Sequence, residues 1–164
     1  MFRIAAFAGF LALAAASNGA ATFDRITLSR TACHGTCPIY TVSVTADGAI
    51  HYGGERFVAQ VGTRSATLDA AGFKRLEAAL ATSDFASLRA NASFDEGCEM
   101  RATDNPSIVL SVVRDGTEKS IHYYLGCRGA AIDADLRRAN EFGRAIDEIL
   151  DTARWVGETD AALQ

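Results

Sequence analysis

The sequence predicts an α+β fold, in which an antiparallel sheet of four to five strands carries two helices packed on one face, in the order β-ββ-α-ββ-α. Three observations predict it. Apolar and polar residues alternate over 39–46, and a second β-rich segment covers 107–114. An Asp-Gly pair, typical of hairpin turns, follows each of these segments. Two further segments show helical spacing of apolar residues, which favours helices covering one side of the sheet.

The first strands follow from period-two patterns. Residues 25–30 are expected to form a short strand, and residues 39–46 a second one. After the Asp47-Gly48 turn, residues 49–52 are expected to return as the partner strand. A Gly-Gly pair interrupts that strand, and we expect residues 56–61 to continue in an extended conformation.

The period then changes to that of a helix. Asp69 is a good N-cap, and the helix is expected to run to about Ala81. Phe73, Leu76 and Leu80 fall on one face at helical spacing, so this face should pack on the sheet.

The second half of the chain repeats this order. Residues 91–105 are polar and are expected to form a loop fixed at Cys98, in which Asp104-x-Pro106 shapes the turn before the next strand. Residues 107–114 are apolar on both faces, which predicts a central strand, and 119–125 should pair with it. The last helix is expected over 133–151, and Trp155 should pack back onto the domain. Its apolar stripe consists of Leu136, Ala139, Phe142, Ile146 and Ile149.

The amino terminus has the three parts of a secretory signal peptide. Arg3 supplies the positive charge, Ile4 to Ala16 form a short apolar segment, and small residues follow up to Ala21. The apolar run is shorter than the roughly 18–20 residues of a membrane-spanning helix. We therefore expect a cleaved signal over 1–21, a single domain over 22–156 and a loose tail over 157–164, with no stable membrane insertion after cleavage. The expected location is the periplasm or the extracellular space.

Composition excludes some partners. The formal net charge is −4, and no cluster of Lys and Arg residues occurs, which argues against nucleic acid as a partner. Motifs for a serine nucleophile elbow, a phosphate-binding glycine loop and a zinc protease helix are missing from the sequence. The sequence thus predicts no enzyme activity and no cofactor.

The four cysteines are expected to form disulfides, because export would place them in an oxidising compartment. Three pairings are possible. We favour Cys33 with Cys37, which lie four positions apart around Gly35, and Cys98 with Cys127, which flank the expected strand–turn–strand unit.

Two other interpretations of the first cysteine pair stay open. Cys33, His34 and Cys37 could bind a soft metal such as Cu(I) through two sulfurs and one imidazole. The two cysteines could instead be redox-active, although the spacing is not Cys-x-x-Cys and a strand, not a helix, follows.

A possible binding face comprises His51, His122 and Tyr124. The two histidines occupy corresponding positions in the two hairpins, so both should lie on the side of the sheet away from the helices. An exposed face with two imidazoles and an aromatic ring could bind a ligand, a metal or a protein. The alternative is an ordinary solvated sheet face.

The chain resembles a family of bacterial secreted or lipoprotein-borne domains of unknown function. The resemblance rests on Cys33-x-Gly35-x-Cys37-Pro38-x-Tyr40 after a strand ending Ser29-Arg30-Thr31, on Thr103-Asp104-x-Pro106, and on Arg154-Trp155-Val156 after the last helix. It spans about residues 27–156 and implies an exported bacterial α+β protein. In this family many members lack counterparts of Cys98 and Cys127, which supports pairing Cys33 with Cys37. The resemblance implies no activity and no catalytic residues.

The sequence thus favours a non-catalytic envelope or periplasmic module that is stabilised by disulfides and binds another protein or a cell-envelope component. The alternative function is a periplasmic metal-binding or thiol-redox protein that uses Cys33, His34 and Cys37.

Overall fold

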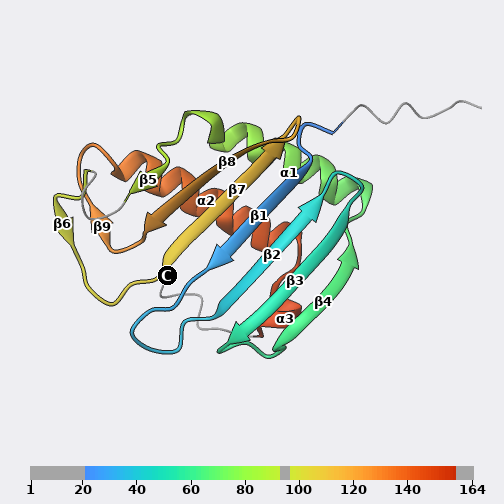
Figure 1. Ribbon diagram of the computed structural model, residues 1–164, viewed down its shortest axis with the longest axis horizontal. Helices are drawn as coiled ribbons and strands as arrows, with labels where there is room; N and C mark the ends of the chain where they lie inside the picture. The colour runs from blue at the N-terminus through green and yellow to red at the C-terminus, as the bar shows by residue number, and fades with distance from the viewer. Residues whose placement is uncertain (1–20, 93–96, 158–164) are drawn as a thin grey trace, which may run out of the picture.

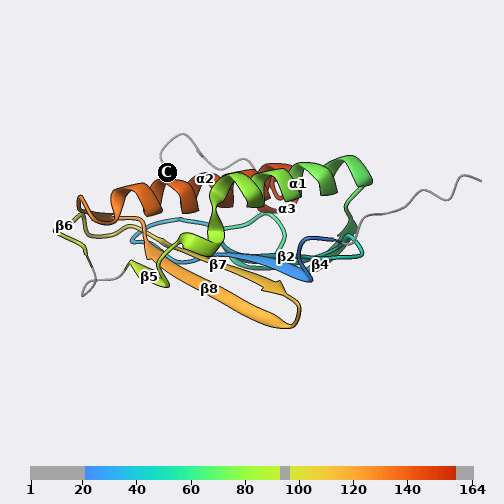
Figure 2. The same ribbon diagram turned by 90° about the horizontal axis from the view of Figure 1, so that it is seen from above.

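The computed structural model describes residues 21–92 and 97–157 as two packed layers, one of β-sheet and one of helices. Figure 2 shows all the labelled helices on one side of the sheet. The expected signal segment and C-terminal tail lie outside the described residues, except for Ala21 and Gly157.

The main sheet contains seven strands in the order β4-β3-β2-β1-β7-β8-β5 (Figure 1). Six of these strands form a continuous antiparallel sheet, and the two-residue strand β5 pairs with β8 in parallel. A separate two-stranded sheet joins β6 to β9. The strands are β1 (Arg25–Arg30), β2 (Ile39–Thr45), β3 (Ala49–Arg56), β4 (Gly62–Thr67), β5 (Asn91–Ala92), β6 (Met100–Arg101), β7 (Ser107–Arg114), β8 (Thr117–Tyr124) and β9 (Cys127–Arg128).

The helical layer consists of α1 (Ala70–Ser83), α2 (Asp133–Ile149) and the short α3 (Ala153–Val156), with a 3-10 turn η1 at Phe85–Ser87. The expected N-cap is confirmed, since the Asp69 carboxylate accepts a hydrogen bond of 2.6 Å from the Gly72 N–H. The expected stripe of α2 is buried at four of its five positions and half-buried at Ile149. Trp155 is also buried, as expected.

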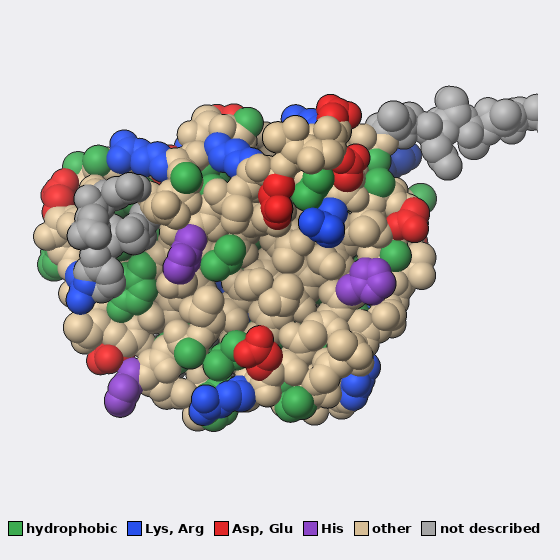
Figure 3. All heavy atoms as spheres, in the orientation of Figure 1, with side chains coloured by type: hydrophobic (Ala, Val, Ile, Leu, Met, Phe, Trp, Pro, Cys, Tyr) green, Lys and Arg blue, Asp and Glu red, His purple; other side chains and the backbone are tan. Residues whose placement is uncertain are grey.

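The two faces of the sheet differ in side-chain chemistry because successive residues of each strand point to opposite sides. The face under the helices is apolar and includes Ile26, Leu28, Val42, Ile108 and Leu110, all at most 1% exposed. The other face carries mainly serine and threonine and is covered by no helix among the described residues. Figure 3 views this side and shows mostly uncharged side chains and backbone across its middle.

The main sheet has more strands than the expected four to five, because the sequence pattern does not reveal β4 and because β5 lies in the segment expected to form a loop. The segment Gly62–Thr67 is exposed at nearly every position, so its sequence lacks the apolar alternation that reveals a half-buried strand. The extended continuation expected over 56–61 is also wrong. After Arg56 the chain leaves the sheet, and the Ala59 and Gln60 N–H groups donate to the Val156 and Trp155 carbonyls.

Within the described residues, no helix is both long enough and apolar enough to cross a membrane.

Candidate functional site

A cavity of about 670 Å³ lies where the first half of α2 meets the loops at one end of the sheet. We call it the α2 cavity. Its volume falls in the range of small-molecule sites. The residues lining it come from both disulfide-bonded regions, from the loop before β7 and from α2: Cys37, Asp104, Asn105, Pro106, Leu125, Arg128, Asp133, Leu136, Arg137 and Asn140.

Two of the motifs that carry the family resemblance meet at this cavity. The Cys33–Cys37 disulfide closes the loop between β1 and β2, with the two Cα atoms 5.7 Å apart. The His34 N–H donates to the Asp104 carbonyl at 3.2 Å, which ties this loop to the one that precedes β7. Cys37 and Asp104 therefore both line the cavity, although they lie far apart in the sequence.

The backbone of Asp104 adopts a left-handed conformation, with φ of 70°. Asp and Asn enter this region more readily than other side chains with a Cβ, so the sequence suits the turn. The Thr103 hydroxyl donates to the Asp104 carboxylate at 3.1 Å. Left-handed non-glycine residues often occur at functional sites, and Asp104 lines the cavity.

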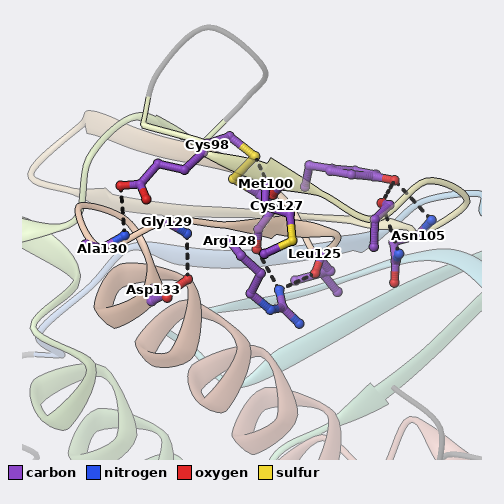
Figure 4. Close-up of a disulfide and its surroundings, with 12 residues drawn as sticks. Cys98, Met100, Asn105, Leu125, Cys127, Arg128, Gly129, Ala130 and Asp133 are labelled. Atoms are coloured by element: carbon purple, nitrogen blue, oxygen red, sulfur yellow. Dashed lines mark hydrogen bonds between the residues drawn. A yellow bond between two sulfur atoms is a disulfide. The ribbon is translucent and has the colours of Figure 1, made fainter.

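Figure 4 shows the second disulfide, Cys98–Cys127, beside Leu125 and Arg128, which both line the cavity. Cys98 and Cys127 have Cα atoms 5.4 Å apart, and the Glu99 N–H donates to the Arg128 carbonyl at 2.9 Å. The Arg128 guanidinium donates to the carbonyls of Leu125 and Cys127. Arg128 is thereby held over the start of α2, where the Asp133 carboxylate accepts from the Gly129 N–H at 3.1 Å.

The polar groups of the cavity carry both signs of charge. Arg128 and Arg137 supply two guanidinium groups, and Asp104 and Asp133 supply two carboxylates. The side chains of Arg137 and Asn140 make no hydrogen bond or ion pair with any other residue of the described ranges. Their hydrogen-bonding capacity is therefore available to a molecule in the cavity.

The second half of α2 carries a closed polar network instead. The Arg30 guanidinium donates to Asp147 at 2.8 Å, and the Tyr40 hydroxyl donates to the other Asp147 oxygen at 2.7 Å. The Thr152 hydroxyl, before α3, donates to that same oxygen at 2.9 Å. The Arg30 and Asp147 side chains are only 13% and 21% exposed. Arg30 and Tyr40 both belong to the motif region that carries the resemblance, and here they fasten α2 to β1 and β2.

A glycine makes room for this network. A Cβ atom at Gly143 would clash with the Ile108 side chain and would come within 3.3 Å of the Arg30 guanidinium. A larger residue here would require the Ile108 side chain to move and would crowd the Arg30 guanidinium.

The network perturbs the protonation of its members. Burial raises the pKa of the Tyr40 hydroxyl well above its usual value, and the nearby Asp147 carboxylate adds to the shift. Burial opposes the charge of Arg30, but Asp147 and Tyr40 outweigh it and raise the pKa of the guanidinium. Arg30 is therefore fully charged and Tyr40 neutral at physiological pH.

The predicted cysteine pairing agrees with the structure, in which Cys33 is joined to Cys37 and Cys98 to Cys127. His34 is exposed and stands beside the first disulfide. Among the described residues, no group of three or more His, Cys, Asp and Glu side chains could hold a metal ion. With both sulfurs bonded to each other, Cys33 and Cys37 offer no thiolate ligand in this state.

The expected binding face does not bring its residues together. His51 and His122 lie on the exposed face, as expected, but on β3 and β8, four strand-to-strand steps apart. At about 4.8 Å per step the imidazoles are roughly 19 Å apart, too far to share one metal ion. Tyr124 instead fixes the loop beside the cavity, because its hydroxyl donates to the Ala102 carbonyl and accepts from the Asn105 N–H.

Sequence reasoning assigned Asp104-x-Pro106 only a turn and missed the cavity residues of α2. Asp133, Arg137 and Asn140 recur at helical spacing beside the apolar stripe, which is the one signal that could have found them. On its own, this spacing indicates only an exposed side of a helix. The cavity arises only because the two disulfide-bonded loops fold over this edge.

The comparison with protein families gives one result: the model of DUF6438, described as a domain of unknown function, matches residues 24–146. The matched region contains every strand, α1 and most of α2, and all the residues that line the α2 cavity. A search of curated proteins found no match.

Proposed function

We propose that this chain, which belongs to the DUF6438 family of domains of unknown function, is an exported bacterial binding module. In this proposal the α2 cavity receives a polar, charged group of a cell-envelope component or a partner protein. The module is non-catalytic. Its two disulfides keep the loops around the cavity in place outside the reducing cytoplasm.

One observation carries this proposal: the two motif segments that are distant in the sequence converge, through the hydrogen bond from His34 to Asp104, on one cavity of ligand size. The Arg30–Tyr40–Asp147 cluster is equally motif-rich, but its oxygen atoms are already occupied by the hydrogen bonds within the cluster. The α2 cavity therefore offers the better binding site.

The chemistry of the cavity suits a ligand that carries both charges. Arginine guanidinium groups recognise carboxylates and phosphates through paired N–H donors, which Arg137 can supply. A carboxylate such as that of Asp104 favours an ammonium group. A peptide or amino-acid group that presents a carboxylate and an amine is the chemical class that matches both.

The test uses NMR of the isotope-labelled protein with three probes: glycine, acetate and methylammonium, followed by soluble peptidoglycan peptides. We expect glycine and the peptides to shift the resonances of Arg137 and Asn140, and acetate or methylammonium alone to act at least about tenfold more weakly. Shifts spread evenly over the surface, or none with any probe, would contradict the proposal.

A matched pair of variants tests the site itself. Arg137→Ala should weaken binding of the zwitterionic probe by about tenfold, which corresponds to the loss of one charged hydrogen bond. Arg144→Ala removes the same residue type seven positions later on α2, outside the cavity, and should leave binding unchanged. Equal losses in both variants would indicate a general charge effect and no specific site.

The alternative function, a periplasmic metal-binding or thiol-redox protein, would use Cys33, His34 and Cys37. It is supported by the exposure of His34 and by the position of Cys37 in the cavity wall. It also requires free sulfurs, whereas the two cysteines are joined. The intact mass of the exported protein, alkylated without reduction, distinguishes the two functions: alkyl adducts or a retained metal would favour the alternative, and their absence the binding module.

A further inference from the structure

The outer edge of strand β4, which is six residues long, is an exposed edge of the main sheet in the described part of the chain. The sheet ends at β4 on one side and at the two-residue strand β5 on the other (Figure 1). All residues of β4 except Ala66 are exposed. Proteins usually protect such edges with proline, with lysine or with a covering segment. Gly62–Thr67 contains neither residue, and its one charged side chain, Arg64, bonds back to Gln60 and the Thr63 carbonyl.

The register shows which backbone groups face outward. The Leu68 N–H donates to the Gly48 carbonyl, so these two residues form a hydrogen-bonded pair of the β3–β4 ladder. Such pairs alternate along antiparallel strands. Gly62, Arg64 and Ala66 therefore direct their N–H and C=O groups toward β3. The groups of Thr63, Ser65 and Thr67 point away from the sheet.

We propose that this edge pairs with the same edge of a second copy of the chain, in antiparallel orientation around a twofold axis at Ser65. In this register Ser65 lies opposite Ser65 of the other copy, and Thr63 lies opposite Thr67. These are the residues whose backbone groups point outward, so the pairing forms about six main-chain hydrogen bonds. The Thr63 carbonyl accepts a hydrogen bond from Arg64 in the single chain and would accept one of these main-chain hydrogen bonds instead.

Side-chain complementarity selects this register. Hydroxyl side chains meet hydroxyl side chains on the open face, and Arg64 lies opposite Ala66, so like charges do not meet. A twofold axis at Arg64 would place two guanidinium groups opposite each other and would align backbone groups already bonded to β3. Val61, which is 62% exposed and directly precedes β4, would be partly covered at the end of the paired segment.

The association is expected to be weak, because a strand-to-strand contact with polar side chains buries little apolar surface. Sedimentation velocity of the purified protein, produced from its full-length reading frame, should show a reversible monomer–dimer equilibrium between roughly 5 µM and 1 mM. A protein that stays monomeric up to about 1 mM would overturn the proposal.

Charge variants test the register. T63K/T67K and T63E/T67E each place like charges opposite each other twice, so each should associate about tenfold more weakly than the original protein. An equimolar mixture of the two variants places Lys opposite Glu and should recover the association. On β3 these positions face only Gly53 and Ala49, so the new side chains have room. Unchanged association of the separate variants, or a mixture that stays monomeric, would overturn the proposal.

Discussion

The two halves of α2 lie on the same sheet but hold their polar groups in opposite ways. In the second half, Asp147 accepts hydrogen bonds from Arg30, Tyr40 and Thr152, and the cluster is largely buried. In the first half, Arg137 and Asn140 line a cavity and bond to no other side chain of the described residues. One helix therefore combines a closed network that fixes its position with an open site that can bind.

This difference indicates how the fold can combine a fixed helix with the proposed binding site. A polar network with every hydrogen bond satisfied specifies one arrangement of its elements, and Gly143 lets α2 approach Arg30 closely enough to form it. An open site needs polar groups with unused capacity, and such groups do not hold a wall in place. On the side of the α2 cavity, the two disulfides hold the surrounding loops in place instead.

The largest expected effect comes from removing the disulfide that braces the cavity wall. The double variant C98A/C127A removes a crosslink between residues 29 positions apart, which in the chain-entropy model costs about 3.6 kcal/mol of unfolding free energy. The variant C33A/C37A opens a loop of only four positions and should cost about 2 kcal/mol. Urea unfolding measures both. Equal losses, or the reverse order, would show that the short loop contributes more than chain entropy.

The same two variants are also expected to differ in ligand binding, measured beside stability. Cys37 lines the cavity, whereas Cys127 is buried and does not line it. A folded C33A/C37A variant should therefore lose affinity for the zwitterionic probe while the Asp147 network keeps α2 in place.

The next largest effect is expected at the network. Asp147→Ala leaves the Arg30 guanidinium, 13% exposed, without its counter-charge, and should lower the unfolding free energy by about 3 kcal/mol. Arg137→Ala on the open half should change stability by less than about 0.5 kcal/mol, since that side chain is exposed and makes no bond to another described residue. Thermal and urea unfolding of the two variants measure this contrast. A loss below about 1 kcal/mol for Asp147→Ala would mean that the network does not fix α2.

Much of this fold could be predicted from the sequence, because strands and helices with one buried face have regularly spaced apolar residues. β1 and β7 match the expected bounds, and the helix N-cap at Asp69 was identified from a single side chain. β4 could not be predicted because this edge strand has no buried face. Gly62–Thr67 therefore lacks the alternation of apolar and polar residues that indicates β2. The disulfide partners could be inferred because each pair closes a local unit.

The candidate site was mostly out of reach of sequence reasoning. The cysteines and Asp104-x-Pro106 stood out, but nothing in the sequence indicated that they meet beside Arg137 and Asn140. That meeting depends on β1 inserting between β2 and β7, which brings the loop after β1 next to the loop before β7. The same topology separates His51 from His122 by four strand-to-strand steps, although both lie on the open face that the similarity of the two hairpins predicted.

The smallest expected effect concerns the pH dependence of the closed half. Because the pKa of Tyr40 is raised in the folded protein, the unfolded chain loses the Tyr40 proton first as the pH rises above about 10. The contribution of neutral Tyr40 is complete below that pH and decreases above it, by up to about 1.4 kcal/mol per pH unit. Tyr40→Phe cannot ionise and should therefore show a shallower decline between about pH 10 and 11. Burial also raises the pKa of Tyr123, to about 12, so some decline remains in the variant. Urea unfolding across this range measures the two slopes. Identical slopes would mean that Tyr40 ionises as easily in the folded protein as in the unfolded chain. The network around Asp147 would then be accessible to water, as the α2 cavity is.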